Sequence, residues 1–146
     1  MDGTSQRYND ILVPVNGTRV ADEALALACN LMRRSKGKVY AVYVIEVART
    51  LALDAEMGEE AQQAEAVLVR AEEIGDELDC KVEGEILQAR DAGHAIVDEA
   101  IERDVSAIVL GFGSDRSELE IGHTARYVLE HALCQVIALR SARQEQ

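Results

Sequence analysis

The chain has 146 residues, of which 48% are hydrophobic, and a formal net charge of −12. This length fits one domain with a hydrophobic core, and the negative charge argues against nucleic acid or an anionic membrane as a partner. No apolar run approaches the ~20 residues of a membrane span, and no basic-then-apolar leader is present, so we expect a cytoplasmic protein without membrane insertion. Residues 1–7 and 141–146 are expected to be flexible tails around a domain at residues 8–140.

The first half of the chain predicts two strands and two helices. The apolar run Asn9–Val15 is typical of a buried strand. Thr18 is then expected to cap a helix that ends at the glycine exit of residues 36–38. A second apolar run, Val39–Val47, predicts another buried strand. Apolar residues at steps of three and four predict a long amphipathic helix over residues 57–78.

The second half continues the same alternation. A mixed pattern at residues 82–88 predicts a half-exposed third strand. The remaining elements are a helix at 96–101, a buried strand at 107–110 ending at Gly111, a helix at 125–132 and a fifth strand at 136–139. Strict alternation of apolar strands with helices indicates an α/β fold with a doubly wound parallel sheet, covered by helices on both faces.

The three cysteines are widely spaced. Cys29, Cys80 and Cys134 form no C-x-x-C pair, which argues against a zinc site and against a redox dithiol. Each has apolar neighbours, so we expect buried, reduced side chains that act as small hydrophobes.

The last strand bears on assembly. Its side chains at 136–139 are uniformly apolar, whereas the third strand carries Lys81, Glu83 and Glu85, the usual protection of an exposed edge. If the last strand lies at a sheet edge, it must be covered. We therefore expect a two-fold homodimer through strand 136–139. Cover by the C-terminal tail is the alternative.

The segment 54–79 is strongly acidic. It holds ten acidic residues and one basic residue, Arg70, for a net charge of −9. Such a helix face is usually solvated, and the second interpretation is a docking surface for a basic protein partner.

Two loops are candidates for chemistry. In an open parallel sheet, ligands bind beyond the carboxyl ends of the strands, where the strand order reverses. The loops there are residues 14–18, after the first strand, and residues 111–124, after the fourth. Glycines before a helix bring backbone N–H groups toward an anion, which points to phosphate.

At these loops the chain resembles the universal stress protein family. The segments that carry the resemblance are residues 11–18, 93–97, 107–111 and 127–136, and together it covers roughly residues 8 to 140. The resemblance implies a five-stranded sheet of order 3-2-1-4-5 and dimers through the last strand. In one branch of the family it also implies AMP, or ATP with Mg²⁺, in the cleft. The residues alone require no cofactor.

The loop departs from the nucleotide-binding pattern of that branch, which reads Gly-x-x-Gly, nine residues, then Gly-Ser or Gly-Thr. Gly111 matches the first glycine, but Ser114 stands at the second position with Gly113 one place earlier. Only seven residues separate Ser114 from Gly122, and His123 replaces the final Ser or Thr. In addition, Asn16 replaces the family's acidic residue after the first strand.

The charge of this loop agrees with that departure. Residues 111–124 carry three acids and one arginine, for a net charge of −2 with His123 neutral. Like charges a few ångströms apart cost on the order of several kcal/mol, whereas a helix N-terminus returns about 1 kcal/mol. We therefore expect weak or absent ATP binding. An adenine nucleotide without a full triphosphate would fit the site more readily. The resemblance implies that Val44 matches a family contact with the adenine base.

The three histidines receive different roles. His123 as a cation would meet a phosphate, and Thr124 follows it at the helix start. We expect His94, near a helix start, to be a surface or capping residue, and His131, late in a helix, to be structural. The candidate binding residues are Pro14, Val15, Asn16, Val44, Gly111, Gly113, Ser114, Gly122, His123 and Thr124, with no metal ligand and no catalytic residue among them.

The resulting hypothesis is a dimeric, non-enzymatic regulatory protein of the stress-response type. Two alternatives stay open: an AMP- or ATP-binding protein with slow nucleotide hydrolysis, and an accessory regulator of a membrane transporter. A phospho-acceptor receiver would need clustered acids after the first strand, where Asn16 stands instead.

Overall fold

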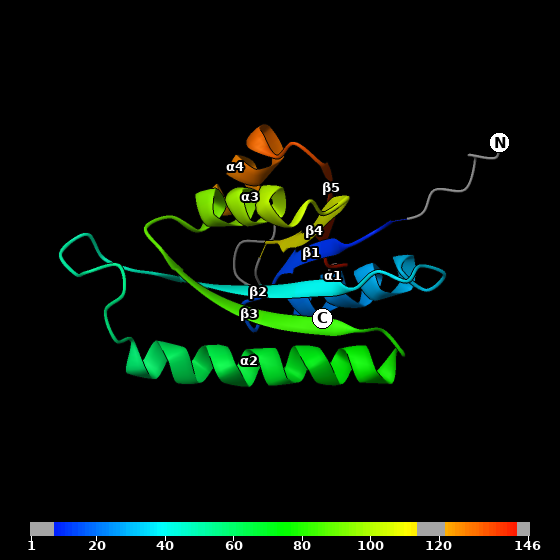
Figure 1. The fold of residues 1–146 in the computed structure, drawn as a ribbon, viewed down its shortest axis with the longest axis horizontal. Helices are drawn as coiled ribbons and strands as arrows, with labels where there is room; N and C mark the ends of the chain where they lie inside the picture. The colour runs from blue at the N-terminus through cyan, green and yellow to red at the C-terminus, as the bar shows by residue number, and fades with distance from the viewer. Residues whose placement is uncertain (1–7, 114–121, 143–146) are drawn as a thin grey trace.

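A computed structural model describes residues 8–113 and 122–142 of the chain (Figure 1). Strands and helices alternate from the first element to the last. In chain order they are β1 (Ile11–Pro14), α1 (Arg19–Leu31), β2 (Val39–Glu46), α2 (Gly58–Glu77), β3 (Val82–Ala89), α3 (Ala92–Arg103), β4 (Ala107–Phe112), α4 (His123–His131) and β5 (Gln135–Arg140).

The five strands form one parallel sheet in the order β3-β2-β1-β4-β5, as expected. The central strand β1 pairs with β2 from Ile11↔Val39 onward and with β4 from Ile11↔Ala107. Because β1 has a partner on each side and helices on both faces, its first three side chains are fully buried, which explains its unbroken apolar run.

Helices cover both faces of the sheet, two on each side (Figure 1). Helices α1 and α2 pack with Ile11, Val13 and Val109 in one core cluster. Helices α3 and α4 pack with Leu12 and Ile108 in the other cluster. The strand residues alternate between the two clusters, so the fold is the doubly wound arrangement that the alternation predicted.

The predicted end of the first helix was wrong. Helix α1 ends at Leu31, six positions before Gly37, the glycine that we took for its exit. A Cβ atom on Gly37 would lie 1.2 Å from the backbone oxygen of Asn9. This glycine therefore serves the close approach of two backbone segments ahead of β1 and β2.

Two further boundaries differ from the prediction. Helix α2 begins at Gly58, so the start of the acidic segment lies in the loop before it. Strand β4 continues to Phe112, so Gly111 lies inside a strand rather than after one. A Cβ on Gly111 would lie 2.7 Å from the backbone oxygen of Val20, so this glycine also permits close packing of α1 on β4.

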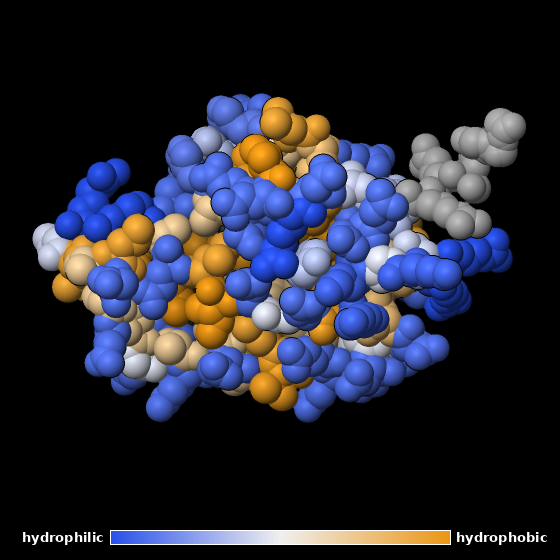
Figure 2. All heavy atoms as spheres, viewed as in Figure 1, coloured by the Kyte–Doolittle hydropathy of each residue, from blue (hydrophilic) through white to orange (hydrophobic). Residues whose placement is uncertain are grey.

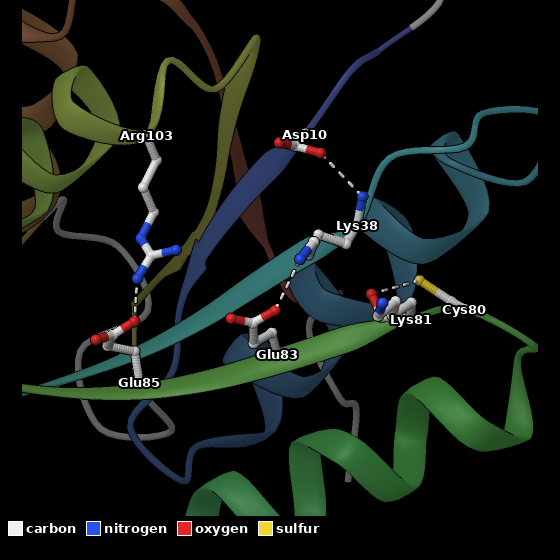
Figure 3. A network of polar contacts seen from close by, with 7 residues as sticks. All are labelled: Asp10, Lys38, Cys80, Lys81, Glu83, Glu85 and Arg103. Atoms are coloured by element: carbon white, nitrogen blue, oxygen red, sulfur yellow. Dashed lines mark hydrogen bonds and ion pairs between the residues drawn. The ribbon is translucent and has the colours of Figure 1, made fainter.

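Strand β3 forms one edge of the sheet, and its charged side chains are paired (Figure 3). Glu83 Oε1 lies 2.9 Å from Lys38 Nζ, and Glu85 pairs with Arg103. The guanidinium of Arg103 also lies 4.2 Å from the ring centroid of Tyr40. The ion pair with Lys38 lowers the pKa of Glu83. This edge therefore carries the charged protection that the sequence suggested.

Strand β5 forms the other edge of the sheet. Leu133, just before it, is 82% exposed, and Ala138 in its middle is exposed as well.

Figure 2 shows hydrophobic side chains gathered over α4 at the top and near the β2–α2 loop at the left, where Leu51 and Leu53 are exposed. Among the described helices, none has the length and apolarity to span a membrane.

All three cysteines are free thiols. Cys29 is buried as expected, whereas Cys80 and Cys134 are only partly buried and pack against the two core clusters. Desolvation by burial raises the pKa of each of the three. They therefore act as packing residues, and a raised pKa keeps the thiols protonated at neutral pH.

Candidate functional site

A crevice of about 410 Å³ opens at the carboxyl ends of β1, β2 and β4. The strand order reverses between β1 and β4, so the crevice lies at the switch point where ligands of doubly wound sheets bind. It is lined by Pro14, Val15, Asn16, Ala21, Val42, Val44, Glu46, Ala92, Ile96, Leu110, Gly111, Phe112, Gly113, Gly122, Thr124 and Ala125.

The floor of the crevice is apolar. Val42 and Ile96 are almost fully buried beneath it, and Val15 is 4% exposed at the end of β1. Val44, two residues beyond Val42 on the same face of β2, continues this surface toward the opening. A flat, apolar face of a ligand would bury its area here at roughly 25 cal/mol per Å².

The β1–α1 loop forms one rim. Asn16 Oδ1 accepts from the backbone N of Thr18 at 3.1 Å and from its hydroxyl at 2.7 Å. Thr18 caps α1 by accepting from the backbone N of Ala21, as expected. Gly17 between them has φ = 88°, a left-handed conformation that favours glycine. With the amide oxygen of Asn16 engaged, and with no described residue accepting from its NH₂ group, that group is a donor for a ligand.

The β4–α4 side carries the available backbone donors. Gly113 follows β4 with φ = 80°, and Gly122 is the N-cap of α4 with φ = −65° and ψ = 167°. A glycine N-cap has no side chain to accept from the first turn. The N–H groups at the start of this nine-residue helix therefore face the crevice without a cap from their own N-cap residue.

The start of α3 forms the opposite side, and carboxylates engage two of its first N–H groups. Ala92 N donates to Glu46 Oε2 at 2.8 Å, and the N-cap Asp91 accepts from His94 N at 3.0 Å. Asp91 Oδ2 also lies 2.6 Å from Nδ1 of His94. These hydrogen bonds with His94 are the main cause that lowers the pKa of Asp91. The carboxylates of Glu46 and Asp91 thus make the start of α3 less favourable for an anion than the start of α4.

His123 does not line the crevice. Its Nε2 lies 3.8 Å from Asp91 Oδ1, so the side chain turns toward the start of α3. Its predicted role as a phosphate contact stays a prediction. His94 and His131 flank Tyr127, with ring centroids 4.1 Å and 4.0 Å from the tyrosine ring. His94 thus packs α3 on α4, whereas His131 stacks on Tyr127 within α4.

The loop that follows β2 is fixed by side chains from the end of β3. Arg90 Nη1 donates to the carbonyl oxygens of Ala48 at 2.6 Å and Leu51 at 2.9 Å. Gln88 Nε2 donates to those of Leu53 at 2.8 Å and Ala55 at 3.0 Å. The connection from β2 to α2 is therefore bound to β3 beside the crevice.

The crevice brings together most of the candidate residues. Ser114 lies outside the described residues, and His123 lies beside the crevice, so eight of the ten candidates line it: Pro14, Val15, Asn16, Val44, Gly111, Gly113, Gly122 and Thr124. Sequence reasoning missed the other eight lining residues, which are Ala21, Val42, Glu46, Ala92, Ile96, Leu110, Phe112 and Ala125. Glu46 lies one residue before the end of the predicted strand Val39–Val47, and no local pattern marks it as a site residue.

Charge on the described walls is negative. Glu46 is the charged side chain among the described residues that line the crevice, and neither Lys nor Arg occurs in that set. Over residues 8–113 and 122–142, no group of three or more His, Cys, Asp and Glu side chains is arranged to hold a metal ion.

Comparisons with known proteins give a consistent result. A model of the universal stress protein family matches residues 7–140. Universal stress protein MJ0531 of Methanocaldococcus jannaschii is 29% identical over 150 aligned positions, covering 94% of this chain and 85% of that protein. The solved structure of a universal stress protein from Archaeoglobus fulgidus is 29% identical with a TM-score of 0.76, covering 90% of this chain and 98% of that one. A structure from the same organism, in complex with dAMP, is 26% identical with a TM-score of 0.74, covering 91% of this chain and 98% of that one.

Proposed function

Because the chain belongs to the universal stress protein family, we propose that it is a stress-response regulatory protein that binds an adenine nucleotide with one phosphate in the crevice. The observation that carries this proposal is the combination of an apolar floor with the uncapped start of α4. The complex of the Archaeoglobus fulgidus relative with dAMP supports the ligand class.

An adenine base and one phosphate suit the two sides of the crevice. The base would lie on the apolar floor formed by Val15 and Val44. The phosphate would accept from the backbone N–H groups that follow Gly122, with Thr124 as a further donor. An anion at a helix N-terminus gains about 0.3–1 kcal/mol from the dipole alone, in addition to these hydrogen bonds.

A triphosphate suits the crevice less well. The described lining holds the carboxylate of Glu46 and no cationic side chain. The sequence between Gly113 and Gly122 adds three acids and one arginine. Each further phosphate charge therefore meets negative rather than positive potential, so we propose weak ATP binding.

Titration calorimetry with AMP, and with ATP in the presence and absence of Mg²⁺, tests this proposal. We expect AMP to bind and ATP to bind at least about tenfold more weakly without Mg²⁺. ATP that binds tenfold more tightly than AMP would overturn the preference, and absence of AMP binding would overturn the function. Release of inorganic phosphate from ATP above background would support the alternative function, slow nucleotide hydrolysis.

Gly122 offers a matched pair of variants. A Cβ at Gly122 meets nothing within 4 Å, and its backbone angles suit any residue. Gly122→Asp places a carboxylate where the phosphate would lie, and Gly122→Asn places a neutral group of the same shape. We expect Asp to weaken AMP binding at least about tenfold and Asn to weaken it less, because only Asp adds charge repulsion. Both side chains favour the N-cap, so both variants should fold.

We also propose that the protein is a cytoplasmic homodimer paired through residues 136–139. The support is the edge position of β5 and the exposed Leu133 beside it. The acidic segment 54–79 remains a proposed docking surface for a basic protein partner, including a transporter. Neutralising Glu59, Glu60, Glu72 and Glu73 without any loss in a pull-down would count against that surface.

A further inference from the structure

Glu46 holds a fixed place at the opening of the crevice. It is the last residue of β2, and its Oε2 accepts from the backbone N of Ala92, the first residue of α3, at 2.8 Å. This hydrogen bond orients the carboxylate against the crevice wall. Oε1 receives no hydrogen bond from the described residues, so one acceptor oxygen stays available to a ligand.

The sheet order sets which end of a nucleotide meets Glu46. Strands β2 and β4 lie on opposite sides of β1. The phosphate is assigned to the β4 side, where the start of α4 offers its N–H groups. A purine carries its sugar on N9, and the six-position lies on the opposite side of the ring system. With the phosphate at α4, the six-position therefore points toward β2, where Val44 and Glu46 line the crevice.

The hydrogen-bonding chemistry of the Glu46 carboxylate determines which purine base it would favour. A carboxylate oxygen accepts hydrogen bonds and donates none, whereas the six-amino group of adenine donates. We propose that Glu46 is a specificity-determining residue that accepts from the six-amino group of the bound base through Oε1. This inference rests on the proposed function, because it takes the ligand to be a purine nucleotide with its phosphate at α4.

A comparison of two nucleotides tests this role directly. Purine riboside 5′-monophosphate differs from AMP only in having hydrogen in place of the six-amino group. Calorimetry on the wild-type protein should show AMP binding about tenfold more tightly, the effect of one charge-assisted hydrogen bond at a site open to solvent.

The Glu46→Gln variant should remove this preference while keeping the fold. The amide oxygen of glutamine continues to accept from Ala92 N, which leaves the NH₂ group in the place of Oε1. Two donors then face each other when AMP binds, so the ratio of the two affinities should fall to within about twofold or reverse. Glu56→Gln, an exposed site in the loop after β2, removes the same charge elsewhere and should retain the tenfold ratio.

The outcomes separate the two proposals. Equal affinity of the wild type for both nucleotides, or an unchanged tenfold ratio in Glu46→Gln with a native circular dichroism spectrum, overturns the role of Glu46 and leaves AMP binding standing. If neither AMP nor purine riboside 5′-monophosphate binds, the proposed function and this inference are overturned together.

Discussion

Asp91 Oδ1 lies 3.8 Å from His123 Nε2, so the N-cap of α3 contacts the first residue of α4. The other carboxylate oxygen of Asp91 accepts from the backbone and the ring of His94. One side chain thus joins the starts of the two helices that flank the crevice, and its removal should loosen both.

We expect Asp91→Ala to lower the free energy of unfolding by about 1 kcal/mol, the usual cost of a lost N-cap. Asp91→Asn should lose less than half as much, because the asparagine oxygen still accepts from His94 N. Urea unfolding followed by circular dichroism measures both. Equal losses in the two variants would contradict the capping role.

The same carboxylate predicts a dependence of stability on pH. Hydrogen bonds with His94 lower the pKa of Asp91 below its usual value of 3.8. A lowered folded-state pKa stabilises the protein above pH 3.8 and loses this effect as the pH falls through the folded-state pKa. The difference in unfolding free energy between wild type and Asp91→Asn should therefore be fully present at about pH 5, shrink as the pH falls below 3.8, and vanish only below the lower folded-state pKa. A difference that does not shrink at all between about pH 5 and the acid limit of folding would show that the ionised form plays no part.

Two glycines offer opposite outcomes for the same substitution. Gly37→Ala would place a Cβ 1.2 Å from the backbone oxygen of Asn9, and we expect a loss of about 3 kcal/mol in unfolding free energy because two backbone segments must separate. Gly58→Ala meets nothing within 4 Å at the start of α2, so it should be neutral or slightly stabilising. Thermal unfolding of the two variants side by side measures this contrast, and similar melting temperatures would refute it.

The proposed dimer predicts a charge effect at β5. Ala138 is exposed in the middle of this edge strand. Ala138→Glu would bring two like charges together at a two-fold interface, so a wild-type dimer at micromolar concentration should become a monomer. Ala66→Glu, on the exposed face of α2, adds the same charge and should remain dimeric. Light scattering after size exclusion gives the mass, and a monomeric wild type would end the proposal.

Local patterns were sufficient to predict the strands. The apolar runs that begin at Ile11, Val39 and Ala107 predicted buried strands because each of these strands has partners on both sides. The order of the strands came with the family resemblance instead, since spacing alone does not tell which strands pair. The predicted end of α1 was wrong because Gly37 is required by the close approach of its backbone to Asn9. This contact joins segments far apart in the sequence, so no local rule describes it.

The candidate site was predicted in part for the same reason. Pro14 and Gly111 lie near the predicted ends of strands and Gly122 precedes a predicted helix, so the switch-point rule found them. Glu46 escaped because its role depends on Ala92, which is 46 positions away in the sequence and adjacent only after β2 and β3 have paired. Residues that act through such a pairing carry no local sequence signal.

The hydrogen bonds of Arg90 and Gln88 to the loop after β2 have a consequence for how a nucleotide would enter and leave. They tie four carbonyl oxygens of that loop to the end of β3, next to Glu46. Displacing this wall would break several hydrogen bonds at once, whereas the start of α4 has no cap from Gly122 and, among the described residues, is held by the contact of Asp91 with His123. Exchange of the ligand should therefore take place past α4, and its rate should respond to changes there rather than to changes along β2.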